Sequence, residues 1–162
     1  MPGRAHPQGV SRSLPPFVRA LAILWALPTT LVGLLLLALA RATGGRAALV
    51  DGVLEAHGGL VRRALMRLPL ACGGDVAVTL GHVVLGTSAS VLDATRAHER
   101  VHVAQCERWG PFFLPAYAIA SLVARLRGAD PYLGNRFERE AFERADARAA
   151  NAARLSGRDA LL

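Results

Sequence analysis

The chain has 162 residues, a formal net charge of +7 and 52% hydrophobic residues, which is enough for one domain with some additional segments. All 19 basic residues are arginine, whereas only 6% of the residues are aromatic. An arginine excess suits anionic lipid head groups or nucleic acid, but the sequence contains no base-stacking or groove-reading motif. We therefore expect no nucleic-acid partner. Cys72 and Cys106 form no CxxC pair and leave the redox compartment open.

The first predicted elements are a flexible tail and a transmembrane helix. The tail covers residues 1–18 and is rich in proline, glycine and arginine. The helix covers residues 19–41, in which LAILWALPTTLVGLLLLALA provides 20 consecutive residues without a charge between Arg19 and Arg41. A helix of this length crosses the hydrocarbon layer, which is about 30 Å thick. The lipid bilayer is therefore a predicted partner of the chain.

The sequence is compatible with either retention of this apolar helix in the membrane or its cleavage as a signal peptide. Its length favours a retained signal anchor and a single-pass protein of the cell membrane, because cleaved signal peptides usually have an apolar run of about 7–15 residues. Ala38-Leu39-Ala40 matches the small-x-small pattern of a signal-peptidase site, so cleavage and export form the alternative. Arginines flank the helix on both sides in nearly equal number, so the side of the membrane that the domain faces stays open.

The rest of the chain is predicted to form one small domain over residues 46–155, followed by a C-terminal tail over 156–162. Its class is α+β and mainly helical, with a short β-hairpin or sheet. Alternation of β-branched and apolar residues predicts strands over 47–57 and 75–86. Helical spacing, interrupted by glycine and proline, predicts the helices, which cover 60–68, 88–109, 111–126 and 134–155.

The helix predicted over 111–126 is apolar but short. Only 16 uncharged residues separate Arg108 from Arg125, which is fewer than a crossing helix needs. We expect this helix to be buried in the protein or to lie in the membrane interface.

An HExxH pattern lies within the helix predicted over 88–109. His98 and His102 are four residues apart, so they lie on one face of a helix and can bind one metal ion together. Glu99 is the candidate catalytic residue, because a carboxylate beside such a pair can take a proton from a metal-bound water. Arg100 has to point away from the ion if the site is to form.

A zinc hydrolase site also needs a third protein ligand and an open fourth position for water. No histidine follows His102, and the last predicted helix offers Glu138, Glu140 and Glu143. Glu138 is the predicted third ligand, because Ala141 one turn later lets this helix pack closely against the first. Glu140 and Glu143 lie on other faces of the helix and are expected to be solvated.

Other polar residues have two interpretations each. Gln105 lies on the same helix face as the histidine pair, so it either orients a ligand or is an exposed polar residue. Tyr117 and Tyr132 either donate a hydrogen bond to a developing oxyanion or are packing residues whose hydroxyl is solvated. If the site cleaves peptides, the strand predicted over 75–86 is the natural edge for an extended substrate.

Two motifs together resemble a known class of enzymes. HERVHVAQ (98–105) followed by FEREA (137–141) is similar to the gluzincin class of zinc metallopeptidases, in which HExxH supplies two ligands and a later Glu-x-x-Ala helix supplies the third. The resemblance implies a zincin-like domain with Zn²⁺ held by His98, His102 and Glu138. It implies Glu99 as the general base.

A wider likeness is to small uncharacterised bacterial membrane proteins that carry an HExxH motif. It covers most of residues 20–145 and implies no substrate. The shared patterns are a WxLPxTxxGLL span (25–35), GHVVLG (81–86), AHERVHVAQCERWGPFFLPAY (97–117) and a DPY…NRFEREA ending (130–141). The chain departs from many Glu-x-x-Ala peptidases at Phe142, where they have an aspartate that supports a zinc ligand. It departs again at Arg96 and Arg100, which place charge beside the histidine pair.

The function predicted from the sequence is that of a membrane-anchored zinc metallopeptidase. Peptide bonds would be hydrolysed by Glu-assisted attack of a zinc-bound water, on membrane or membrane-proximal proteins. The alternative is a non-enzymatic membrane protein with a structural metal site or no metal, which contacts lipid or a protein partner. The sequence does not indicate an oligomeric state.

Overall fold

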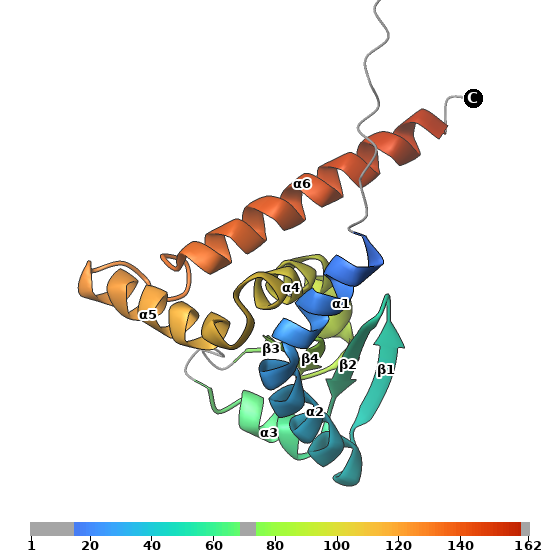
Figure 1. The fold of residues 1–162 in the computed structure, drawn as a ribbon, viewed down its shortest axis with the longest axis vertical. Helices are drawn as coiled ribbons and strands as arrows, with labels where there is room; N and C mark the ends of the chain where they lie inside the picture. Colours follow the sequence, from blue (N-terminus) through green and yellow to red (C-terminus); the bar gives the residue numbers. More distant parts are fainter. Residues whose placement is uncertain (1–14, 69–73, 160–162) are drawn as a thin grey trace, which may run out of the picture.

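The sheet contains four short strands instead of the two long ones expected from the sequence (Figure 1). The computed structural model describes residues 15–68 and 74–159. β2 and β4 pair in parallel, so the strand order is β1-β2-β4-β3 and β3 lies at one edge. The strands form two hairpins, β1 (Arg46–Val50) with β2 (Val53–His57), and β3 (Ala77–Leu80) with β4 (Val83–Gly86).

Two tight turns divide the expected strands. Asp51 and Gly52 connect β1 to β2, and both have a positive φ, of 49° and 79°. Gly81 and His82 connect β3 to β4, with a φ of 64° at Gly81. Turns with positive φ at these positions match the twist of two paired strands, and a continuous strand cannot contain them. Each of the two strands predicted from the sequence is therefore interrupted at its centre.

Helices cover both faces of the sheet (Figure 1). They are α1 (Pro16–Trp25), α2 (Leu27–Ala42), α3 (Gly59–Leu65), α4 (Ala89–Trp109), the short 3₁₀ helix η2 (Gly110–Phe112), α5 (Phe113–Leu126) and α6 (Arg136–Asp159). α2 and α3 share a hydrophobic core with Val83 and Leu85 of β4, whereas Val84 packs on the opposite face against α4. α6 in turn packs on α4. The chain is thus mainly helical α+β, as predicted.

Both predicted tails are shorter than expected. α1 already begins at Pro16, so the last residues of the segment 1–18 are helical. α6 continues to Asp159, so most of the tail predicted over 156–162 belongs to a helix. Residues 1–14, 69–73 and 160–162 lie outside the described part of the chain.

The segment expected to form one transmembrane helix over 19–41 consists of two helices. α1 and α2 meet at Ala26, and their axes are bent by 66° relative to each other. Pro28 in the first turn of α2 lacks the backbone N–H that would continue the α1 hydrogen-bond ladder. One face of α2 is buried against the sheet, including Thr30 and Gly33. A single straight helix over 19–41 is therefore not what the chain forms.

Two stretches have the length and composition of a membrane-crossing helix. Among the described residues, Ala89–Leu126 meets both criteria, and the bent pair of α1 and α2 would do so if it were one span. Core helices of soluble proteins and signal sequences meet the same criteria. Location in the cell membrane therefore stays a prediction.

Two arginines fix α4 on the sheet. Arg96 donates two hydrogen bonds to the carboxylate of Glu55 on β2, at 3.1 and 3.0 Å, and Arg100 donates a third at 2.9 Å. Arg100 also donates to the backbone oxygen of Val50, at 2.7 Å. These contacts lie on the side of α4 opposite the histidine pair, because a residue two positions away is rotated by about half a turn. Arg100 thus points away from the candidate ion position, as the site requires.

α2 approaches the sheet closely at Gly33. A Cβ atom at this position would lie 2.7 Å from Val83 Cβ and 2.8 Å from the backbone oxygen of Leu80. Since backbone atoms cannot move aside as a flexible side chain can, any side chain here would separate the two layers.

We predict that Gly33→Ala lowers the free energy of unfolding by about 1–3 kcal/mol through this overpacking. Denaturant unfolding of the purified protein measures the change. Ala38→Leu, on the exposed face of the same helix, is the control and should stay within about 0.5 kcal/mol. If α2 did not pack on the sheet, Gly33→Ala would instead stabilise the helix, by about 1 kcal/mol.

Candidate metal centre

α4 and α6 carry the side chains of the site. α4 begins after Ser88, whose hydroxyl oxygen accepts a hydrogen bond from the backbone N–H of Val91 at 3.3 Å. α6 begins after Asn135, whose Oδ1 accepts from the backbone N–H of Phe137 at 2.9 Å. Ala141 of α6 is fully buried, so the two helices can approach closely. These features set Glu138 in the first turn of α6, opposite α4.

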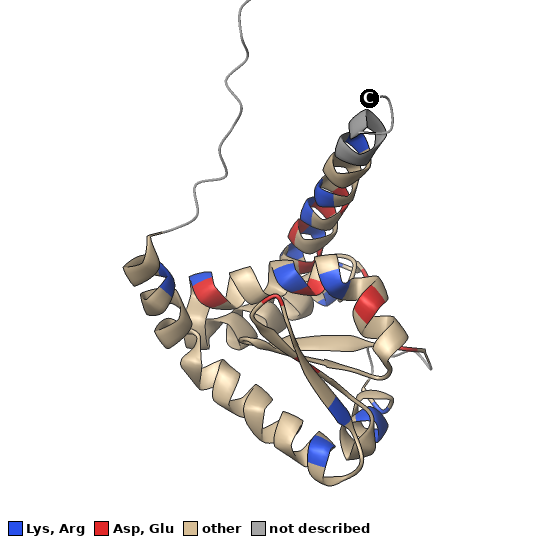
Figure 2. Cartoon of the chain, turned by 90° about the vertical axis from the view of Figure 1, so that its right-hand side faces the viewer, with Lys and Arg blue, Asp and Glu red and all other residues tan. Residues whose placement is uncertain are grey.

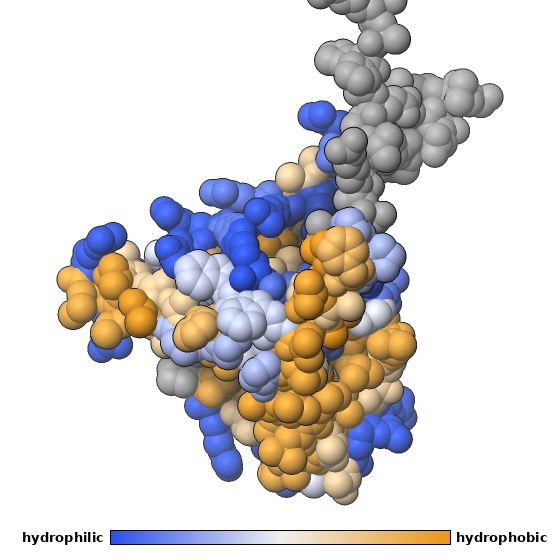
Figure 3. Space-filling view, in the orientation of Figure 1, coloured by the Kyte–Doolittle hydropathy of each residue, from blue (hydrophilic) through white to orange (hydrophobic). Residues whose placement is uncertain are grey.

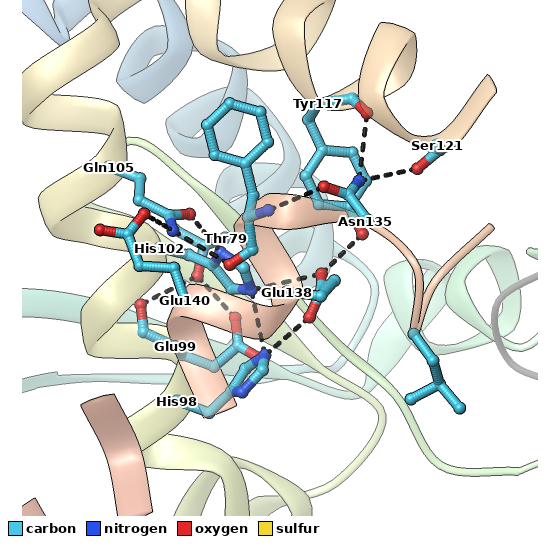
Figure 4. Close-up of polar contacts among 12 residues, drawn as sticks. Thr79, His98, Glu99, His102, Gln105, Tyr117, Ser121, Asn135, Glu138 and Glu140 are labelled. Carbon is cyan, nitrogen blue, oxygen red and sulfur yellow. Dashed lines mark hydrogen bonds and ion pairs between the residues drawn. The ribbon is translucent and has the colours of Figure 1, made fainter. Parts of the chain in front are cut away.

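The three predicted ligands converge on one point (Figure 4). His98 Nε2 lies 3.0 Å from His102 Nε2 and 3.0 Å from Glu138 Oε2, and His102 Nε2 lies 3.4 Å from Glu138 Oε1. Ligands about 2.0–2.1 Å from a tetrahedral Zn²⁺ are about 3.3 Å apart from one another. The spacing of the three side chains therefore fits a tetrahedral ion with little movement.

Gln105 fixes the ring of His102. Its Oε1 lies 2.8 Å from His102 Nδ1, while its Nε2 donates to the backbone oxygen of Phe137 at 3.0 Å and to Glu140 Oε2 at 2.9 Å. Both of these partners only accept, so the amide oxygen has to face the imidazole. In the neutral ring Nδ1 then carries the proton, and Nε2 is free to bind a metal ion. These contacts agree with the orienting role, and Gln105 is buried instead of exposed.

The ring of His98 is not oriented by a hydrogen bond at Nδ1 as the ring of His102 is. Its Nδ1 is buried and has no hydrogen-bond partner within the described part of the chain. The ring packs instead against Phe142, with 4.6 Å between ring centroids. Phe142 stands where many Glu-x-x-Ala peptidases have an aspartate, so the departure seen in the sequence coincides with the unpaired nitrogen. The two imidazoles are therefore held in different ways, His102 by a hydrogen bond and His98 by ring packing.

Tyr117 supports the third ligand. Its hydroxyl donates to Glu138 Oε1 at 2.6 Å, which orients the carboxylate toward the imidazoles. Burial and this hydrogen bond raise the pKa of Tyr117, so the hydroxyl keeps its proton. Burial and the nearby Glu138 carboxylate also raise the pKa of Tyr132. A hydrogen bond with Glu138 contributes to the shift at Tyr132 as well, but the short bond of 2.6 Å is the one from Tyr117.

Charge at the site favours a cation beside Glu138. Burial raises the pKa of Glu138, but hydrogen bonds with His102 and His98 outweigh this effect and lower the pKa to about 2. Burial lowers the pKa of His102, but the adjacent Glu138 carboxylate reverses the shift, so the pKa is raised overall. The site thus holds a carboxylate in its charged form within reach of two nitrogen donors.

Glu99 lies beside the ligands and is held by the sheet. The hydroxyl of Thr79 on β3 donates to Glu99 Oε2 at 2.6 Å, and Oε1 has no hydrogen-bond partner among the described residues. Burial raises the pKa of Glu99, although the nearby His102 opposes the shift. One carboxylate oxygen is therefore fixed, and the other is available to accept a proton.

A cavity of about 690 Å³ opens next to the ligand atoms. Its walls are the edge strand β3, α4, the first turns of α5, and α6, and Tyr132 reaches it from the loop before α6. His98, Glu99, His102 and Glu138 all line it. The volume lies in the range of about 300–1,000 Å³ that is usual for small-molecule and peptide sites.

The sequence did not indicate every residue of the site. Thr79 was missed, because nothing in its strand marks it as the partner of Glu99. Asn135 was missed too, although an asparagine just before a helix is a typical cap; its Nδ2 also donates to Ser121 Oγ at 2.8 Å and so ties α5 to α6. Glu140, expected to be solvated, is half-buried and accepts from Gln105 and Arg108.

Comparison with known proteins gives no further assignment. The chain has no significant match among protein-family models, curated protein sequences or solved structures.

We predict that Gln105→Leu lowers zinc affinity by about 10- to 100-fold, because His102 loses the hydrogen bond that fixes its ring. Competition with a fluorescent zinc chelator measures the affinity. Arg108→Met is the matched control: it removes one of the two exposed arginine partners of Glu140, leaves Arg144 in place, and should keep the affinity within about threefold of the wild-type value. Equal losses in both variants would contradict the orienting role.

We predict that Phe142→Asp raises zinc affinity by about tenfold, because the carboxylate supplies an acceptor for His98 Nδ1. Ala147→Asp adds the same charge to the exposed face of α6, away from the cavity, and controls for long-range electrostatic attraction. An affinity that rises equally in both variants would show that the charge, and not the hydrogen bond, is responsible.

Proposed function

We propose that this chain is a membrane-associated zinc metallopeptidase. The observation that carries the proposal is the convergence of His98, His102 and Glu138, with ligand atoms 3.0–3.4 Å apart, beside a buried glutamate at the wall of a cavity. The resemblance to gluzincins, seen in the two sequence motifs, points to the same residues.

The donor set and its HExxH spacing are compatible with catalytic zinc. Two imidazole nitrogens and one carboxylate oxygen are a set typical of catalytic Zn²⁺. No fourth His, Cys, Asp or Glu joins the group among the described residues. Structural zinc sites usually have four protein ligands, whereas catalytic sites leave one position open. A Zn²⁺ ion bound there would supply Lewis acidity and lower the pKa of a water toward about 7.

Glu99 is the proposed general base. Thr79 holds one of its carboxylate oxygens, so the free Oε1 can accept the proton of the attacking water. The pKa of Glu99 is raised by burial, which moves it toward the range where a base works well at neutral pH. Tyr132, which keeps its proton and lines the cavity, is the proposed donor to the oxygen of the carbonyl under attack.

The cavity suits an extended peptide. β3 is an edge strand of the described sheet and forms one wall, so its outward backbone groups, unpaired among the described residues, can pair with a substrate strand. Phe113, Leu114 and Phe142 give the cavity apolar contacts for a substrate side chain. Peptide-bond hydrolysis is therefore the reaction that the site supports best.

Association with a membrane rests on the exposed apolar helices. Leu24 on α1, Leu35 on α2 and Leu126 on α5 are 63%, 71% and 77% exposed, which is unusual for leucines in water. The alternative to an enzyme is a membrane protein in which the same three ligands hold a structural metal, or none. The cavity beside the ligands favours the enzyme, because structural sites are closed.

We predict that the purified protein contains about one zinc ion per chain and that Glu138→Gln loses it. Elemental analysis after dialysis measures the metal content. Glu143→Gln, at an exposed position of the same helix, is the control and should retain the metal. A wild-type protein without zinc would contradict the proposal.

We predict that Glu99→Gln keeps the zinc but lowers kcat for peptide hydrolysis by at least about 100-fold, because only the proton acceptor is lost. Cleavage of a quenched fluorescent peptide library measures the rate. Glutamine retains an oxygen for the Thr79 hydrogen bond, so the fold should be unchanged. Unchanged turnover in this variant would reject the mechanism, and zinc without any turnover in the wild type would favour the structural alternative.

A further inference from the structure

An apolar surface runs along the outside of α1 and α2 (Figure 3). Leu31 and Leu35 of α2 are 55% and 71% exposed, on the face opposite the one that packs on the sheet. At the bend, Trp25 is half-exposed and contacts Phe112 of η2, with 6.1 Å between ring centroids. This contact joins the surface to α5, where Ile119 is 62% exposed. Water is a poor environment for an apolar surface of this extent.

Arginine is the only charged residue type on α1, α2 and α5 (Figure 2), and acidic residues lie directly beyond the apolar segments, at Asp51, Glu107 and Asp130. Residues 15–50, 59–68 and 110–129 contain no aspartate or glutamate. The arginines of these segments are all exposed, and none forms an ion pair among the described residues; they are Arg19, Arg41, Arg46, Arg62, Arg63, Arg67, Arg125 and Arg127. Apolar helices whose own charged residues are all arginine match the interface of a bilayer that contains anionic lipids.

The packing of α2 argues against a membrane crossing. α2 has 16 residues and is about 24 Å long, less than the hydrocarbon thickness. Its inner face is fixed to the sheet, and Thr30 Oγ1 accepts a hydrogen bond from the backbone N–H of His82 at 3.2 Å. If α2 crossed the bilayer, the sheet would enter the hydrocarbon with unpaired backbone groups on its edge strands. Lipid excludes such open edges.

We infer that α1, α2 and α5 bind the protein to one leaflet of an anionic bilayer, with Ala20 in α1 and Ala42 at the end of α2 accessible from the same side of the membrane. The cavity of the metal centre then opens at the membrane surface. α5 connects the membrane-binding surface to the cavity, because Leu114 is 38% exposed and also lines the cavity next to Phe113 and Tyr117.

A substrate class follows, and this part rests on the proposed peptidase function. A cavity at the bilayer surface receives the extended segments of membrane proteins that lie just outside the hydrocarbon. Segments within the bilayer would not reach this cavity. The β3 edge, which is proposed to pair with the substrate, lies on the side of α2 that packs on the sheet and not on the side that faces lipid.

Flotation with lipid vesicles tests the docking surface. The full-length Glu99→Gln protein should float with vesicles of phosphatidylglycerol and phosphatidylcholine, and bind about tenfold less to phosphatidylcholine alone. The double variant Leu31→Glu and Leu35→Glu should lose about tenfold in binding to the anionic vesicles. Ala147→Glu with Ala150→Glu changes the net charge equally on α6 and should retain binding. No binding, or equal losses in both double variants, would overturn the inference.

Cysteine labelling tests the topology. The single substitutions Ala20→Cys and Ala42→Cys are introduced into a Cys72→Ser and Glu99→Gln background, in which Cys106 is buried and does not react. In sealed membrane vesicles, a membrane-impermeant maleimide should label both positions from one side and neither from the other. Labelling from opposite sides would show that the bent pair crosses the bilayer and would overturn the inference. Both assays use a protein without the catalytic base, so their outcome is independent of whether the chain cleaves peptides.

Discussion

The close packing of α6 on α4 is the contact on which the candidate site depends. It places a carboxylate from residue 138 within 3.0–3.4 Å of two imidazoles that lie 36–40 residues earlier in the chain. Ala141 makes this possible, because a larger side chain at this fully buried position would push the helices apart. Asn135 and Tyr117 add hydrogen bonds that fix where α6 begins and how Glu138 points. An isolated buried carboxylate is unfavourable, so the imidazoles and any cation between them are part of what keeps the helices together.

The ligands could be predicted from the sequence because they depend on local helical geometry. His98 and His102 are four residues apart on one helix face, and Ala141 lies three residues after Glu138 on the face of a second helix. Thr79 could not be found in this way, since its contact with Glu99 depends on how the sheet packs under α4. The turns at Asp51-Gly52 and Gly81 were overlooked although their glycines were visible, because the alternation of apolar residues continues across each hairpin. Periodicity alone does not distinguish one long strand from two short ones.

The apolar run before the domain shows a different limit of sequence analysis. Its composition indicates that the side chains avoid water, but composition does not say whether lipid or protein replaces the water. In α2 the two faces differ: Gly33 and Thr30 face the sheet, so protein replaces the water there, while Leu31 and Leu35 face outward, where lipid would replace it. Small residues on one side of the helix and large ones on the other were already present in the sequence. They became informative only once the partner of the small face was known.

The unequal support of the two histidines has a consequence for how the metal would exchange. His102 can turn away from an ion only if the contacts of Gln105 with Phe137 and Glu140 are also rearranged. His98 can rotate against Phe142 without breaking any hydrogen bond of its own at Nδ1. Dissociation would therefore begin at His98, and such a centre would gain and lose its ion readily. Its occupancy would follow the concentration of free metal ion around the protein, so that metal availability itself would set the fraction of chains that hold an ion.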